Sequence, residues 1–325
     1  MYQDNFNDKI LKRWQPCFDN VVSKRFVHKA FLSEVFLTDS HKYTDDTFLI
    51  SAFLPRSHLY YNDSIRQIDV SLVLEVFRQC SIYISHSFCS IPIDFKFIFD
   101  SAHFNILNNY LDSKNVTDNY RVVIVAKIVQ SKIKKGILVG IVLDMSMYIN
   151  SQLYATKTMD ISFFQPKIWE KLRRSAQNVE YSINNIQPAP KEMVAKKLDS
   201  NIAIGNLICN DKMFCSTLMP NMQHPAFFDH PLDHIPASLI FESLRQHALF
   251  AAFQYNVSVE CLSLKEIIVE FKSFCEFFNV TQCCSERNDV YMQNDDFMID
   301  IQVISNDKVC VVSKLKFAIL RIGND

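Results

Sequence analysis

Two long apolar segments stand out in the pattern of hydrophobic and polar positions along the chain. In VSLVLEVFRQCSIYI (70–84), apolar residues surround the helix axis except for a narrow stripe of Glu75, Arg78 and Gln79. The segment ASLIFESLRQHA (237–248) repeats the pattern, with Glu242, Arg245 and Gln246 at the same spacing. A helix that is apolar on nearly every side must be buried on most sides. The pattern therefore predicts two buried helices.

Strand-like runs flank both predicted helices. A short run and then a turn-rich stretch precede each helix, and β-branched or alternating runs bounded by Asn, Asp, Lys and Gly follow it, which is typical of antiparallel strands. The predicted strands of the first half are 33–39, 93–100, 120–130, 137–149 and 151–164, with a hairpin turn at 130–136, and those of the second half are 200–208, 265–274, 297–304 and 308–320.

The chain contains an internal duplication. LVLEVFRQ (72–79) aligns with LIFESLRQ (239–246) at an offset of 167 residues, and the register continues upstream without a gap. The further matched positions are Val27 with Val194, Lys29 with Lys196, Val35 with Ile202, Leu37 with Ile204, Tyr60 with Phe227 and Tyr61 with Phe228. Chance seldom sustains such a register, so the two halves are expected to share one fold.

One long helix wrapped by an antiparallel sheet in each half is the hotdog architecture, so we predict an α+β double hotdog. The expected organisation is an N-terminal extension (1–26), a first hotdog repeat (27–165), a short helix and linker (166–193) and a second repeat (194–325). PKIWEKLRRSAQ (166–177) is predicted to form the short helix, because Pro166 suits a first turn.

Composition and charge exclude several classes of function. The net charge of −1 gives no electrostatic reason to expect nucleic acid or an anionic membrane as a partner. Four glycines leave no dinucleotide or Walker-type phosphate loop, and the longest apolar run (136–149) is too short for a membrane span. The ten cysteines lie mostly in apolar segments and form no CxxC pair. The first residues lack the apolar core of a signal peptide. We therefore expect a reducing, cytoplasmic location.

Four segments resemble the AfsA-like A-factor biosynthesis hotdog family. They are VHKAFLSEVFLTDS (27–40), LPRSHLYYND (54–63), LVLEVFRQ (72–79) and above all HPAFFDHPLDHIPASLIFESLRQHA (224–248). The resemblance implies a double-hotdog acyltransferase that moves a β-ketoacyl group from a carrier-protein thioester to the hydroxyl of dihydroxyacetone phosphate, toward γ-butyrolactone or butenolide signals. The chain departs from the family pattern at Ala237, where glycine is expected, and at Val70, where proline is expected.

The resemblance and the sequence together nominate a site before the second helix. Unpaired N–H groups at a helix N-terminus suit a developing oxyanion, and DHPLDH (229–234) lies directly ahead of it. His230 and His234 are the candidate catalytic histidines, with Asp233 as a candidate substrate contact or as a residue that orients the loop. The first half has no histidine at this place, and Asp69 is predicted to be its N-cap. We therefore expect asymmetric chemistry, centred on the second half.

The polar stripes allow two interpretations. In the functional one, Glu242 takes the proton of the acceptor hydroxyl and an arginine holds the acceptor phosphate. The candidate substrate-binding residues are then Arg245, Gln246, Glu75, Arg78 and Gln79. In the structural one, glutamate and arginine neutralise each other and glutamine bridges them, because buried charges must be paired. The sequence leaves both open.

The leading prediction is an acyltransferase that takes its acyl group from an acyl carrier protein or coenzyme A thioester and has a small phosphorylated acceptor. No cofactor is expected beyond the donor's phosphopantetheine arm, and no metal, because His230 and His234 lie in a proline-bounded loop without a third ligand. The chain is expected to be a monomer or a homodimer. Two alternatives stay open: a dehydratase or thioesterase using His230 and Glu242, which keeps the dehydratase spacing of six residues from Pro236, and a non-catalytic scaffold that binds acyl groups or carrier proteins.

Overall fold

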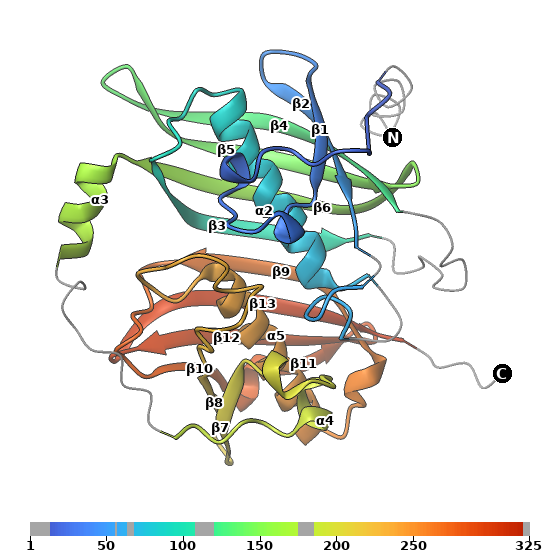
Figure 1. Ribbon diagram of the computed structural model, residues 1–325. Helices are drawn as coiled ribbons and strands as arrows, with labels where there is room; N and C mark the ends of the chain where they lie inside the picture. The colour runs from blue at the N-terminus through green and yellow to red at the C-terminus, as the bar shows by residue number, and fades with distance from the viewer. Residues whose placement is uncertain (1–13, 56, 64–67, 108–119, 175–184, 321–325) are drawn as a thin grey trace. The chain divides into compact units, whose positions relative to one another are not determined.

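The computed structural model describes residues 14–320 except Arg56, 64–67, 108–119 and 175–184 (Figure 1). The chain forms two compact units. The first comprises Met1–Asn62, Arg66–Phe99 and Phe104–Trp169, and the second comprises Asp63–Ile65, Asp100–His103 and Glu170–Asp325. No helix among the described residues is both long and apolar enough to cross a membrane.

The first unit is an antiparallel sheet that packs on one long helix (Figure 1). Its strands run in the order β1-β2-β4-β5-β6-β3, and the helix α2 (Val70–Ser87) lies across them. The strands are β1 (Leu37–Lys42), β2 (Thr47–Phe53), β3 (Lys96–Ile106), β4 (Arg121–Lys134), β5 (Ile137–Ile149) and β6 (Gln152–Phe164). Because α2 is apolar on nearly all sides, thirteen of its residues are buried, including Phe77 and Val76.

The second unit repeats this arrangement around the helix α5 (Ala237–Gln254). Its strand order is β9-β13-β12-β10-β8-β7, with β11 paired to β12. The strands are β7 (Ile204–Cys209), β8 (Met213–Leu218), β9 (Leu262–Phe271), β10 (Thr281–Glu286), β11 (Val290–Gln293), β12 (Asp296–Ser305) and β13 (Lys308–Ile319). Each half therefore has the helix-on-sheet architecture of a hotdog, which confirms the α+β double hotdog.

The duplication is confirmed at the level of element boundaries. Four elements of the first unit recur in the second with every boundary shifted by 167 residues. They are η1 (Lys24–Val27) and α4 (Lys191–Val194), η2 (Leu32–Glu34) and η5 (Asp199–Asn201), β1 and β7, and α2 and α5. Even the left-handed residue after the first turn recurs, as His28 and Ala195.

Some elements differ from the sequence-based expectation. The predicted helix 166–177 is observed as α3 (Pro166–Arg173), and its last residues lie outside the described part of the chain. Strands β2 and β8 fill segments that we expected to be turn-rich. β2 is buried at six of its seven positions, so it lacks the polar alternation of a half-exposed strand. The polar and cysteine-rich sequence of β10, TQCCSE, likewise carried no strand pattern.

A buried lysine in the first unit should make its stability depend on pH. Lys157 lies in β6 with only 2% of its surface exposed, and burial, offset in part by the nearby Glu75 carboxylate, lowers the pKa of its ammonium group to about 7. The unfolded chain, with a lysine pKa near 10.5, keeps a proton that the folded chain has lost between these two values. The free energy of unfolding therefore falls progressively as the pH falls from 10.5 to 7, because the unfolded chain binds a proton that the folded chain does not.

We expect Lys157→Met to raise the free energy of unfolding by about 2–4 kcal/mol at neutral pH. The difference from wild type should shrink as the pH rises toward 10.5. Urea unfolding at several pH values measures it, with exposed Lys127→Met as the control. A gain that is the same at every pH would contradict this account.

Candidate active site

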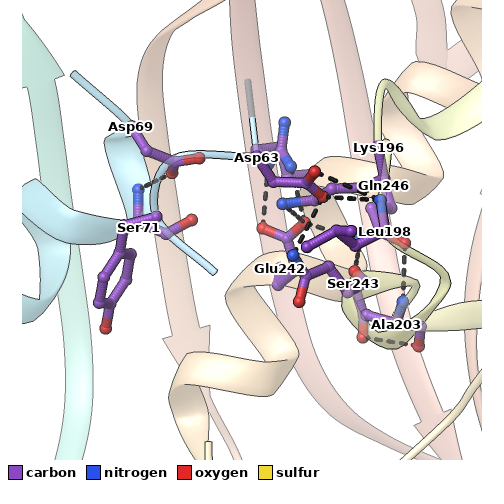
Figure 2. A network of polar contacts seen from close by, with 12 residues as sticks. Asp63, Asp69, Ser71, Lys196, Leu198, Ala203, Glu242, Ser243 and Gln246 are labelled. Atoms are coloured by element: carbon purple, nitrogen blue, oxygen red, sulfur yellow. Dashed lines mark hydrogen bonds and ion pairs between the residues drawn. The ribbon is translucent and has the colours of Figure 1, made fainter. Parts of the chain in front are cut away.

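The stripe residues of α5 form an ion-pair network in the second unit, around the buried carboxylate of Glu242 (Figure 2). Arg245 donates to both carboxylate oxygens of Glu242, from Nε at 3.0 Å and from Nη2 at 2.6 Å. Gln246 Nε2 donates to Oε1 at 2.7 Å, and Lys196 Nζ lies 3.2 Å from the same oxygen. The Glu242 side chain is fully buried. Two cations and an amide therefore surround one buried carboxylate.

This environment fixes the charge of Glu242. Burial alone would raise the pKa of its carboxyl, but Arg245 and Lys196 hold that pKa well below its ordinary value. A general base works best with a pKa near the working pH. The contacts of Glu242 thus favour the structural interpretation of the stripe, in which the charges neutralise each other.

The same network occurs in the first unit. Arg78 donates to Glu75 from Nε at 2.7 Å and from Nη2 at 2.9 Å, Gln79 donates to it at 2.8 Å, and Lys29 lies at 3.2 Å. The pKa of the Glu75 carboxyl is likewise low. Burial would raise this pKa, but the lowering effect of Arg78 and Lys29 is larger. A feature present in both halves is part of the duplicated fold, so by itself it marks neither half as the site of chemistry.

The glutamines connect each helix to the chain that enters its sheet. Gln246 accepts from Ala203 N at 2.8 Å and donates to Asn201 O at 2.8 Å (Figure 2). Gln79 makes the equivalent bonds to Phe36 N, at 3.0 Å, and to Glu34 O, at 2.7 Å. Each stripe therefore anchors its helix to the segment just before β1 or β7.

The halves differ in the segment that leads into the helix. Asp69 is the N-cap of α2, where its carboxylate accepts from Ser71 N at 2.7 Å, as the sequence predicts (Figure 2). Pro236 takes that position before α5 and makes no side-chain cap. A capping carboxylate thus occupies the N-terminus of α2, whereas α5 begins without one.

His230 belongs to an aspartate–histidine pair in the loop before α5. Its Nδ1 lies 2.6 Å from Oδ1 of Asp229, whose side chain is only 3% exposed, while the His230 side chain is 36% exposed. The buried carboxylate orients the imidazole and favours the tautomer with hydrogen on Nδ1. Nε2 is then the acceptor nitrogen, and it makes no hydrogen bond with any residue that the structure describes.

His234 forms a second pair with Asp233, at 2.6 Å, and this pair is held by Arg173. Arg173 donates to Asp233 O at 2.7 Å and to Asp233 Oδ2 at 3.3 Å, and it makes a two-point contact with Glu276 at 2.6 and 2.7 Å. Its guanidinium lies 4.4 Å from the centre of the Phe274 ring, against which His234 also packs. Arg173 therefore positions the histidine loop.

The sequence pattern does not identify this role for Arg173, because it predicts only a short helix over 166–177. The partners lie 60 and 103 residues away, and nothing in the local pattern indicates them. Within the described residues, no three His, Cys, Asp or Glu side chains gather in a way that could hold a metal ion.

Removing Arg173 should loosen the loop. We expect Arg173→Met to reduce the free energy of unfolding of the second unit by about 2 kcal/mol, because Glu276 and Asp233 lose their shared cation. The exposed neighbour Arg174→Met is the matched control and should change it by less than about 0.5 kcal/mol. Chemical denaturation of both variants measures these changes in the free energy of unfolding. Equal changes in the two variants would contradict the role of Arg173.

Solved structures share this fold. A pyran synthase domain from module nine of the sorangicin pathway is similar over 88% of this chain and 98% of its own, with a TM-score of 0.53 and 10% identity. The 12:0-ACP thioesterase from Umbellularia californica is similar over 86% of this chain and 99% of its own, with a TM-score of 0.50 and 10% identity. At these identities the likeness shows the fold alone.

Relatives in sequence point to one group of proteins. A 2-oxo-3-(phosphooxy)propyl 3-oxoalkanoate synthase from Streptomyces virginiae is 23% identical over 236 residues, which are 70% of this chain and 76% of that protein. A protein of the same name from Streptomyces coelicolor is 22% identical over 180 residues, 55% of this chain and 56% of that protein. The family model for the AfsA A-factor biosynthesis hotdog domain matches residues 15–165 and 180–320, and this chain belongs to that family.

Proposed function

We propose that this protein is an acyltransferase that moves a β-ketoacyl group from a thioester to the hydroxyl of dihydroxyacetone phosphate or a similar phosphorylated acceptor. The observation that carries the proposal is membership of the AfsA family together with two relatives whose shared name describes a 3-oxoalkanoate ester of a phosphorylated three-carbon ketone. The donor is an acyl carrier protein or coenzyme A thioester, and its phosphopantetheine arm is the only carrier group that the reaction needs.

The proposed reaction is a single exchange of acyl partners. The acceptor oxygen attacks the thioester carbonyl, the carbon–sulfur bond breaks, and the products are an oxygen ester and a free thiol. The acceptor hydroxyl loses one proton and the leaving thiolate takes one up, so no net acid or base is consumed. A base that accepts and then returns the proton satisfies this balance.

The pair of His230 and Asp229 is our candidate for that base. Nε2 of His230 is the acceptor nitrogen of a partly exposed side chain whose Nδ1 is held by a buried carboxylate, which is the arrangement that a general base requires. We propose that His230 acts as the base. His234 and its partner Asp233, from the same loop, are proposed to lie next to it in the site. The N-terminus of α5, which lacks a side-chain cap, would stabilise the carbonyl oxygen as it gains charge.

The acceptor requirement tests this proposal. With a β-ketoacyl thioester, we expect thiol release to rise at least tenfold when dihydroxyacetone phosphate is added, since water is a poor substitute for a bound acceptor. Unphosphorylated dihydroxyacetone should give little increase. Equal release with and without acceptor would indicate a thioesterase, and no release across several acyl lengths would favour a binding scaffold.

A further inference from the structure

Two cysteines of the second unit lie directly opposite each other on neighbouring strands. Cys215 of β8 pairs in register with Cys284 of β10, and the two Sγ atoms are 2.7 Å apart. Both are free thiols. Directly opposed residues of an antiparallel pair have Cα atoms about 4.5–5.5 Å apart, within the range that a disulfide spans. The spacing of paired strands is therefore compatible with a bond between them.

The pair lies on the face of the sheet that points away from α5. The next residues along the two strands, Ser216 and Ser285, face the helix and hydrogen-bond to His247 at 2.8 and 3.2 Å. Because successive side chains of a strand alternate between faces, Cys215 and Cys284 point to the other side. Cys284 is partly exposed, so a small solute can reach the pair.

The two thiols have different roles available to them. Either sulfur can donate the hydrogen bond that joins them, so either can be the thiolate while the other keeps its proton. The thiolate is the reactive form of cysteine. Cys284 is partly exposed whereas Cys215 is buried, so Cys284 is suited to attack an oxidant and Cys215 is suited to close the bond afterwards.

We propose that Cys215 and Cys284 form an oxidative modification site, at which a peroxide converts the dithiol into a disulfide that joins β8 to β10. The Cys284 thiolate displaces hydroxide from the peroxide and becomes a sulfenic acid. The Cys215 sulfur then displaces hydroxide from that sulfenic acid. Two thiols and one hydrogen peroxide yield one disulfide and two waters, with sulfur oxidised and peroxide oxygen reduced. The site is separate from the proposed acyl transfer and does not depend on it.

A second thiol pair provides an internal comparison. Cys275 and Cys310 are also in contact, but they are only 1% and 3% exposed, so peroxide should reach them far more slowly. Cys209 is an exposed cysteine at the end of β7. Replacing it removes a reactive surface thiol without touching the proposed pair.

The test treats the reduced full-length chain with one equivalent of hydrogen peroxide, blocks the remaining thiols with N-ethylmaleimide and maps the peptides without reduction. We expect a mass loss of about 2 Da, a 215–284 cross-linked peptide and a rise of several degrees in Tm that dithiothreitol reverses. Cys215→Ser should stop at a sulfenic acid on Cys284 that dimedone traps, and Cys209→Ser should behave as wild type. A chain that keeps its thiols, or a 275–310 cross-link in place of 215–284, would overturn the proposal.

Discussion

Glu242→Gln should destabilise the second unit by about 3–5 kcal/mol, because it leaves the Lys196 and Arg245 charges without their buried counter-ion. Glutamine keeps the shape of the side chain, so the loss reports charge and not packing. Two cations now approach Oε1 of Glu242 at 3.2 and 2.6 Å. Urea unfolding of the full chain, followed by a probe in each unit, measures the effect.

The matched variant Glu75→Gln should weaken the first unit by a similar amount, since Lys29 and Arg78 surround Glu75 in the same way. Both low carboxyl pKa values contribute stability that is present above the ordinary value of 4.5 and is lost as the pH falls below it. The two variants should therefore be less acid-sensitive than wild type. A Glu242→Gln protein with unchanged stability and no activity would instead make Glu242 the base.

His230→Asn should lower the rate of acyl transfer by about 10²–10⁴-fold, the usual contribution of a general base. Asparagine keeps a donor toward Asp229 but offers no titratable nitrogen to the acceptor. Because the His230 side chain is 36% exposed, the free energy of unfolding should change by less than about 1 kcal/mol. Steady-state rates and denaturation curves on the same preparation separate the two quantities.

Asp229→Asn is the companion variant, since it keeps the side-chain shape and removes the carboxylate that orients His230. It should reduce the rate less than His230→Asn does. A His230→Asn enzyme with wild-type rates would move the base elsewhere in the loop, and His234→Asn would then be the variant to measure.

The sequence predicts those parts of the fold that depend on local patterns of residues and on the internal repeat. The helices α2 and α5 follow from segments that are apolar on all sides except for one polar stripe, and the duplication follows from a constant offset of 167 residues. Strands β2 and β8 escaped prediction because they are buried on both faces and carry no alternation. The structure identifies them as strands through their pairing, β2 with β4 and β8 with β10.

The candidate site divides in the same way. The pairing of Glu242 with Arg245 follows from their spacing of three residues, which places them on one helix face. The participation of Lys196 does not, because it reaches Glu242 from a segment before β7 that lies more than forty residues upstream. The contacts of Arg173 with Asp233 and Glu276 could not be predicted for the same reason. Ion pairs between distant segments depend on tertiary contacts, which a local sequence pattern does not indicate.

We propose that this chain joins a β-ketoacyl group to a phosphorylated acceptor through the histidine loop of its second unit. The most direct test is mass spectrometry of the product formed from a β-ketoacyl thioester and dihydroxyacetone phosphate labelled with ¹³C at all three carbons. We expect an ester that carries the label and its phosphate, and we expect the His230→Asn protein to form it at least about a hundredfold more slowly. Free β-keto acid without label, formed at the same rate in both proteins, would contradict it.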